Sequence, residues 1–232
     1  MVPLVVIRPQ PGCNATVAAA AAAGLDVRSH PLFTIVPCSW QAPDPARFSA
    51  LLAGSANVFR HGGRGLAALR HLPVYAVGET TAAAARAAGF TVAAVGSGGL
   101  QGVIDTQVPA GAHLLRLAGD ERVALHLTPG LLMEERVVYA SQPVPLPADL
   151  ADLLRAPAII AAHSADAVRH LTAQCVSHGI RRAPLRIAAL GQRIAAAAGD
   201  GWGEVAVAAA PSDQALLALA RQMCQDPGPK GR

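Results

Sequence analysis

Short apolar runs alternate with Ala-rich stretches along most of the chain. A short apolar run bounded by Gly or Pro predicts a buried strand, and a longer Ala-rich stretch predicts a helix. Because a helix is predicted between most neighbouring strands, the pattern is typical of parallel sheets with crossover helices, the α/β class. The predicted strands cover residues 4–7, 26–30, 50–53, 74–77, 91–95, 113–117, 135–140, 158–162, 186–190 and 204–208.

Two proline-rich segments interrupt this alternation. Residues 31–45 (PLFTIVPCSWQAPDP) and 141–147 (SQPVPLP) contain several prolines and no helical period, so both are predicted to be extended connectors. A chain that passes through one connector, builds a domain and returns through the other has a discontinuous first domain. The sequence therefore predicts two domains, the second inserted into the first.

An internal repeat indicates that the two halves are alike. Residues 72–95 resemble residues 184–208, since both read as strand, glycine, polar pair, Ala-rich helix, aromatic residue and strand. Residues 51–57 similarly resemble residues 159–166, each a buried strand followed by a Ser at the start of a helix. Each half is therefore predicted to place small or hydroxyl residues at two adjacent strand-to-helix turns.

The strand-to-helix turns carry the candidate chemistry. In an open parallel sheet, ligands bind beyond the carboxyl ends of the strands, where helix N-termini offer unpaired N–H groups to an anion. Gly78 would permit close backbone approach, and Thr80 and Thr81 could cap the helix or donate to a carboxylate. A simple N-cap role for Thr80 is the alternative. In the matching turn after Gly191, Arg193 would either bind an anion directly or stay solvated on its helix.

Composition narrows the classes of partner. The 232 residues are 52% hydrophobic and 15% charged, which is enough apolar content for a sizeable core. A net charge of +4 suits an acidic ligand. Binding of nucleic acid is not expected, because only 3% of the residues are aromatic and could stack on bases, and no long basic run could follow the phosphates. No apolar run approaches the roughly 18 to 20 residues of a membrane-spanning helix, and the N-terminus lacks a signal-peptide pattern. We expect a soluble cytoplasmic protein without nucleic-acid or membrane partners.

Several other kinds of site lack their motifs. The four cysteines are scattered without a C-x-x-C pair or a suitably spaced His, so neither a metal site nor a disulfide framework is expected. The glycine-rich segment 96–102 departs from the dinucleotide pattern because Gln101 stands at the third glycine position. The only lysine is Lys230, which excludes a P-loop and Schiff-base chemistry. The tail, residues 226–232, is predicted to be disordered.

Five ordered segments carry a resemblance to a known family. They are VVIRPQPG with its Ala-rich helix and PLFTIVP, the turn LLAGSAN, the run VYAVGETTAAAARAAGF, the segment LLRLAGDERVALHLTPGLLMEERVVYAS, and the closing LGQRIAAAAGDGWGEVAVAAAPSDQALLALA. Together they resemble the uroporphyrinogen-III synthase family over nearly the whole chain. The resemblance rests on the order of the segments and on the VGxxT turn, since no single motif is sharp.

The resemblance implies a fold. It consists of two similar doubly wound parallel-sheet α/β domains, HemD-like and flavodoxin-like, joined by a two-stranded linker with a cleft between them. Mapped onto this chain, the first domain comprises residues 1–36 and 144–232, and the inserted domain comprises residues 43–139. The linkers are then residues 37–42 and 140–143.

The resemblance also implies an activity. Family members are lyases that cyclise the linear tetrapyrrole hydroxymethylbilane to uroporphyrinogen III, without a cofactor, in haem and porphyrin biosynthesis. Loss of the bilane hydroxyl gives a cationic azafulvene, attack by ring D gives a spiro intermediate, and reclosure leaves that ring inverted. The substrate carries carboxylates on its acetate and propionate arms, which suits a mildly basic protein with helix N-termini at its site. We expect a monomer that makes transient contact with the upstream hydroxymethylbilane synthase.

The predicted site combines the family's turns with the residues singled out above. Thr80 or Thr81 is predicted to polarise the departing hydroxyl. The residues predicted to bind substrate are Arg8, Ser55, Asn57, Gly78, Gly119, Ser164 and Arg193.

This sequence departs from the family pattern in two places. The second Gly-x-Thr turn reads GQRI at residues 191–194, so a hydroxyl contact is lost and Arg193 is the proposed substitute. Some family members also place a functional Tyr on the helix after the strand that here ends at Ala162. This chain has VRH at residues 168–170 and no Tyr there.

Two other classes of function stay open. A non-catalytic intracellular two-lobed α/β binder of a polycarboxylate or another small anion would use the same cleft. A degenerate homologue with a scaffold function is the second. Ligand protection without product formation would separate either class from the enzyme.

Overall fold

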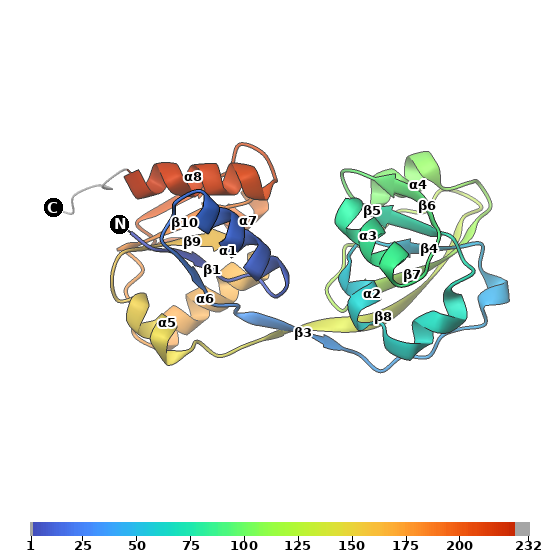
Figure 1. Ribbon diagram of the computed structural model, residues 1–232, viewed down its shortest axis with the longest axis horizontal. Helices are drawn as coiled ribbons and strands as arrows, with labels where there is room; N and C mark the ends of the chain where they lie inside the picture. Colours follow the sequence, from blue (N-terminus) through green and yellow to red (C-terminus); the bar gives the residue numbers. More distant parts are fainter. Residues whose placement is uncertain (1, 226–232) are drawn as a thin grey trace. The chain divides into compact units, whose positions relative to one another are not determined.

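The computed structural model describes residues 2–225, which divide into two compact units (Figure 1). Of the described residues, unit 1 contains 2–34 and 143–225, and unit 2 contains Ile35–Gln142. The predicted first domain ended at residue 36 and resumed at residue 144, close to these positions. The predicted disorder of residues 226–232 concerns a segment outside the described residues.

Unit 1 is a five-stranded parallel sheet with helices on both faces. Its strands are β1 (Leu4–Val6), β2 (Val27–Ser29), β9 (Ala158–Ala162), β10 (Leu185–Ala189) and β11 (Glu204–Val207), in the order β11-β10-β9-β1-β2. Its helices are α1 (Gly12–Ala22), α5 (Ala148–Leu153), α6 (Ala165–Ser177), α7 (Gln192–Ala196) and α8 (Asp213–Gln225). Helices α1 and α8 bury one face of the sheet, and α5, α6 and α7 bury the other (Figure 1).

Unit 2 is a six-stranded sheet covered unequally on its two faces. Its strands are β3 (Phe33–Pro37), β4 (Ala50–Ala53), β5 (Val74–Val77), β6 (Val92–Gly96), β7 (His113–Gly119) and β8 (Leu132–Pro143), in the order β3-β8-β7-β4-β5-β6. Its helical segments are η1 (Pro45–Arg47), α2 (Asn57–His61), η2 (Gly63–Leu69), α3 (Glu79–Ala87) and α4 (Leu100–Gln107). α2, η2 and α3 pack against one face, whereas α4 covers the other.

The predicted α/β fold with parallel sheets is confirmed, and the segments predicted to be linkers, residues 37–42 and 140–143, adjoin or belong to two paired strands. Residues 140–143 are the end of the long strand β8, and Pro37 ends β3, which lies beside β8 in the sheet. The Cys38 amide donates to the Val138 carbonyl at 3.0 Å and the Val144 amide to the Leu32 carbonyl at 2.9 Å, so these segments run antiparallel. Proline is compatible with this pairing because β3 is an edge strand, where one side of the strand needs no backbone N–H for hydrogen bonds within the sheet.

The strands of the two sheets lie in the same spatial order, but the chain visits them in a circularly permuted sequence. Strands β11, β10, β9, β1 and β2 of unit 1 correspond to β6, β5, β4, β7 and β8 of unit 2. The predicted repeat is part of this match, since β5, α3 and β6 correspond to β10, α7 and β11. One connection differs, because helix α1 joins β1 to β2 whereas the irregular residues 120–131 join β7 to β8.

This order places a topological switch point in each unit. The chain path reverses between β9 and β1 in unit 1, and between β4 and β7 in unit 2. Ligands of open α/β sheets bind at such points, beyond the carboxyl ends of the strands. The two switch points are therefore the places where functional side chains are expected.

Candidate functional site

The predicted site residues lie at strand-to-helix turns or strand ends in both units. Unit 2 carries Ser55, Asn57, Gly78, Thr80, Thr81 and Gly119, and unit 1 carries Arg8, Ser164 and Arg193.

The turn between β5 and α3 depends on glycine for its backbone conformation. Gly78 is the N-cap of α3 with φ of 75°, a region that side chains other than glycine rarely adopt. A Cβ built there would meet no atom within 4 Å, so the glycine is explained by its backbone angle rather than by a close neighbour. Gly191, its match in unit 1, has φ of −167°, an extended conformation open to any residue. The two turns are alike in sequence but not in backbone.

The adjacent threonines point into different surroundings. Thr81 is 4% exposed and faces the core under α3, whereas Thr80 is exposed. The matching positions in unit 1 repeat this division, because Ile194 is 9% exposed and Arg193 is exposed. Thr80 is therefore the one of the two whose hydroxyl is exposed, while the role predicted for Thr80 or Thr81 stays a prediction.

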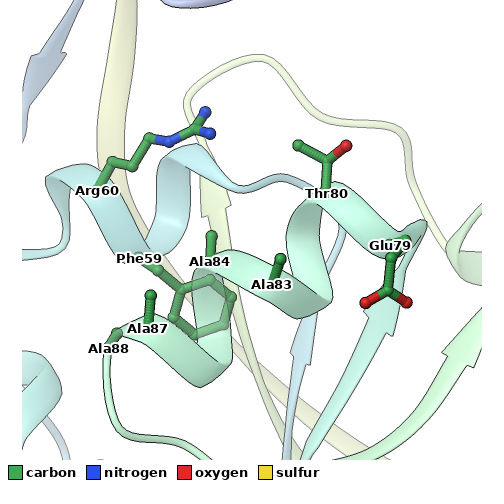
Figure 2. A pocket seen from close by; sticks show the side chains of 8 residues that line it. All are labelled: Phe59, Arg60, Glu79, Thr80, Ala83, Ala84, Ala87 and Ala88. Atoms are coloured by element: carbon green, nitrogen blue, oxygen red, sulfur yellow. The ribbon is translucent and has the colours of Figure 1, made fainter.

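Thr80 lines a hollow in unit 2. Its volume is about 680 Å³, and Phe59, Arg60 and the alanines of α3 form much of its wall. Figure 2 shows Thr80 and Arg60 extending toward the same side of the view, whereas Glu79 points the other way. Glu79 is paired with Arg86 on its own helix. A hydroxyl and a guanidinium therefore face this hollow together.

A second, smaller hollow of about 140 Å³ lies at the switch point of unit 2 and brings Ser55 and Gly119 together. The Ser55 Oγ accepts from the Asn57 amide at 3.2 Å, which leaves the hydroxyl hydrogen free to donate. Gly119 pairs across the sheet with Tyr139, and a Cβ on Gly119 would lie 2.7 Å from the Tyr139 ring. The glycine thus makes room for Tyr139, which also lines the hollow and was not predicted from the sequence.

Arg116 is a functional candidate that the sequence analysis did not single out. It lies on β7, is 3% exposed, and donates from Nη1 to Glu135 Oε1 at 2.7 Å. Arg122 donates from Nε to the other carboxylate oxygen at 2.9 Å. Burial alone would raise the pKa of Glu135, but the two arginines outweigh it and hold the pKa below its ordinary value. The signal in the sequence was a charged residue inside the apolar strand LLRLA.

In unit 1, the switch point is filled by side chains of the chain itself. Arg8 Nη1 donates to the Asp213 carboxylate at 3.1 and 3.2 Å, and Thr16 Oγ1 donates to it at 3.0 Å. His163 Nε2 lies 3.1 Å from the same carboxylate. Arg8, predicted to bind substrate, therefore holds an internal carboxylate from the start of α8. This pairing was missed because Arg8 and Asp213 are 205 positions apart in the chain.

Ser164 and Arg193 have separate environments. Ser164 is the N-cap of α6, and its Oγ accepts from the Ala167 amide at 3.2 Å. The neighbouring Asp166 is paired with Arg169, so these residues form no hydrolytic triad. Arg193 is exposed on α7, and no ion pair joins it to any residue in the range 2–225. Their roles in substrate binding stay predictions.

Stability of unit 1 should fall as the pH falls, because of His163. Burial and the Arg8 charge lower the pKa of His163 below its ordinary value of 6.5 and outweigh the Asp213 carboxylate, which raises it. As the pH falls, His163 therefore takes up its proton at a higher pH in the unfolded chain than in the folded one. The stabilisation is complete above the pKa of the unfolded state and is lost as the pH falls through the pKa of the folded state. Urea midpoints measured between about pH 7 and pH 5 should decrease, and less so in His163→Gln.

The pKa of His61 in unit 2 is also lowered, by burial and by the charge of Arg60. The difference between the wild-type and His163→Gln profiles isolates the His163 contribution. Parallel profiles for the two proteins would contradict it.

Within residues 2–225, no helix is both long and apolar enough to span a membrane. Over the same range, no group of three or more His, Cys, Asp or Glu side chains is placed to hold a metal ion.

A family model and several solved structures match this chain. The family model described as uroporphyrinogen-III synthase HemD matches residues 14–218. The uroporphyrinogen-III synthetase structure from Helicobacter pylori 26695 is similar at 18% identity, covering 96% of this chain and 100% of that chain with a TM-score of 0.65. A mutant uroporphyrinogen III synthase from the extremely thermophilic bacterium Thermus thermophilus is similar at 16% identity, covering 97% and 100% with a TM-score of 0.53. No curated protein sequence matches the chain.

Proposed function

The chain belongs to the uroporphyrinogen-III synthase family, and from that premise we propose that its strand-end residues hold hydroxymethylbilane for cyclisation to uroporphyrinogen III. The reaction class is that of a lyase, EC 4.2.1.75, in tetrapyrrole biosynthesis. The observation that carries the assignment is the family match over residues 14–218. The geometry adds exposed donors at the carboxyl edge of unit 2, where an anionic substrate would be expected to bind.

Thr80 is the proposed contact for the departing hydroxyl. Its side chain is exposed beside Arg60 at the 680 Å³ hollow, on the first turn of α3 (Figure 2). A hydrogen bond donated to the substrate hydroxyl would favour its loss as water. The nearby Arg60 would attract the carboxylate arms of the substrate, since a guanidinium binds carboxylates with two parallel hydrogen bonds.

The main task of the protein is conformational. The enzyme must hold the bilane so that ring D attacks through its substituted carbon rather than its free position. A difference of about 3 kcal/mol between the two closure geometries gives more than a hundredfold preference. Charge-assisted hydrogen bonds contribute roughly 1.5 to 3 kcal/mol each, so a few contacts to carboxylate arms are sufficient.

A coupled assay tests the proposed function. Hydroxymethylbilane is generated in situ, the protein is added, and the oxidised I and III porphyrin isomers are separated chromatographically. We expect predominantly the III isomer. Formation of the I isomer alone, at the spontaneous rate and with folded protein, would support a non-catalytic anion binder instead.

Thr80→Val should lower kcat or the fraction of III isomer by roughly three- to tenfold, because one hydrogen bond of about 0.5 to 1.5 kcal/mol is lost. Thr80→Ser keeps the hydroxyl and should retain most activity. Thr172→Val is the matched control, since Thr172 bonds only to the Val168 carbonyl within its own helix. Unchanged kinetics and isomer ratio in Thr80→Val would remove Thr80 from the site.

We also propose that the protein acts as a cytoplasmic monomer that takes its substrate from hydroxymethylbilane synthase. Sedimentation velocity at assay concentrations tests the monomer. The transfer is tested by comparing the reaction on substrate generated in situ by the synthase with the reaction on pre-formed substrate. Direct transfer should reduce the amount of I isomer, which forms from substrate released to solution.

A further inference from the structure

The two switch points differ in what occupies them. In unit 1, the Asp213 carboxylate, at the first residue of α8, receives hydrogen bonds from Arg8, Thr16 and His163. This is a complete carboxylate site in which the protein supplies the carboxylate. The permuted strand order allows each of these positions to be compared with its counterpart in unit 2.

The counterparts of His163 and Asp213 in unit 2 carry neither an imidazole nor a carboxylate. Strand β9 is followed by His163, whereas β4 is followed by Gly54. The first residue of α8 is Asp213, and the first residue of α4 is Leu100. The Leu100 side chain lies over Gly54, 2.9 Å from where a Cβ on Gly54 would stand. Both residues line a hollow of about 400 Å³, which is within the range of small-molecule sites.

Beside this hollow, unit 2 has a buried arginine at the position where unit 1 has a core valine. Val6 pairs with Ala161 one residue before the end of β9, and Arg116 pairs with Leu52 one residue before the end of β4. Val6 belongs to the core that α1 covers. Arg116 lies under the irregular residues 120–131 that stand in place of that helix, and it lines the hollow.

Arg116 has hydrogen-bonding capacity left over. A guanidinium carries five N–H donors, and Glu135 takes a bond from Nη1. Its Nε is buried and has no hydrogen-bond partner anywhere in residues 2–225. Arg116 is also the charged residue among those lining the hollow, whose other polar side chain is Gln101.

The start of α4 supplies further donors. Its N-cap is Gly99, with φ of 110°, and no side chain caps the first turn of this helix. The first N–H groups of a helix have no partner within it and favour an anion. Leu100, Val77 and Leu125 provide apolar walls that suit a pyrrole ring. The glycine-rich segment 96–102 thus has a use other than the dinucleotide site that its sequence excluded.

We infer that this hollow, which we call the Arg116 pocket (Gly54, Val77, Gly99, Leu100, Arg116 and Leu125), binds one carboxylate arm of the substrate. The substrate carboxylate binds to Arg116 and the start of α4, beside Leu100, which stands at the position of Asp213, and its pyrrole ring lies against the apolar wall. This inference rests on the proposed function, because it takes the tetrapyrrole as the ligand. Arg116 is a binding residue here and takes no part in loss of the hydroxyl.

The test uses two variants that act by different means. Arg116→Met with Glu135→Gln removes the charges of the buried Arg116 and its partner together, and the charge that then loses its counter-ion, Arg122, is partly exposed to solvent. Ala124→Trp fills the pocket from residues 120–131 without changing any charge, and Ala124 is exposed. The controls are Arg155→Gln on the surface of unit 1 and Ala110→Trp, an exposed alanine that does not line the pocket.

Both pocket variants should raise the KM for hydroxymethylbilane about tenfold or more, while kcat changes by no more than about threefold, because ground-state and transition-state binding are lost together. The controls should match the wild type. Wild-type KM in both pocket variants, with folding confirmed by circular dichroism, would overturn the inference and leave the proposed function standing.

A binding measurement keeps the two proposals separable. If the wild type yields no III isomer, the proposed function fails. Binding of uroporphyrin III, a stable probe that carries carboxylates, is then measured by the quenching of its fluorescence, and this measurement tests the pocket. Weaker quenching by both pocket variants than by the wild type supports it, and equal quenching by all proteins overturns it.

Discussion

Ile160→Ala should lower the free energy of unfolding of unit 1 by about 2–5 kcal/mol, among the largest effects of any single truncation in this chain. Ile160 is 0% exposed on β9, the middle strand of its sheet. It pairs with Val5 of β1 on one side and Ile187 of β10 on the other, and all three belong to one apolar cluster. The truncation therefore leaves a cavity that strands on both sides hold open.

Urea unfolding followed by circular dichroism measures this change. Val176→Ala is the matched control, because Val176 is 71% exposed on α6 and its truncation should change the midpoint little. Equal destabilisation by the two variants would show that burial on β9 is not what stabilises unit 1.

Asp213→Ala should lower the free energy of unfolding by about 2 kcal/mol, since it removes charge-assisted bonds that solvent screens only in part. The carboxylate is 40% exposed and its partners Arg8 and His163 are 32% and 7% exposed. Without it, Arg8 loses its counter-ion and His163 loses the group that raises its pKa. The variant should also be more sensitive to acid than the wild type.

Asp152→Ala is the control for charge removal. Asp152 is 83% exposed and meets Arg155 at 3.8 Å, an ion pair that should contribute little. The free energies of unfolding from urea titrations at neutral pH and at about pH 5.5 provide the comparison. An Asp213→Ala protein as stable as Asp152→Ala at both values would contradict a structural role for the Asp213 cluster.

The permuted likeness of the two units has a functional consequence. Unit 1 uses its switch point to tie α8 to β1 and β9, through Asp213, Arg8 and His163. Unit 2 has hollows at its switch point, with Ser55 and Arg116 among the residues that line them. Under the proposed function, the duplicated architecture assigns stability to one copy of the site and ligand binding to the other.

The amino-acid sequence by itself determined the fold class and the turns. Apolar runs of strand length separated by Ala-rich stretches predicted parallel sheets, because burial on both faces of a strand demands such runs. The VGETT turn predicted Gly78 at a helix start and a hydroxyl nearby, since glycine alone adopts that backbone angle freely. The proline-rich connectors marked where the chain passes between units, close to the boundaries at residues 34 and 143.

Only the tertiary structure decided which side chains meet. Thr80 and Thr81 are neighbours in sequence, yet α3 exposes one and buries the other because of how it packs on its sheet. Arg8 finds Asp213 across 205 positions, and Gly119 meets Tyr139 through the register of β7 and β8. Local periodicity determines which face a residue occupies, but its neighbours on that face depend on strand order and register. Those are properties of the assembled sheet, and no short stretch of sequence encodes them.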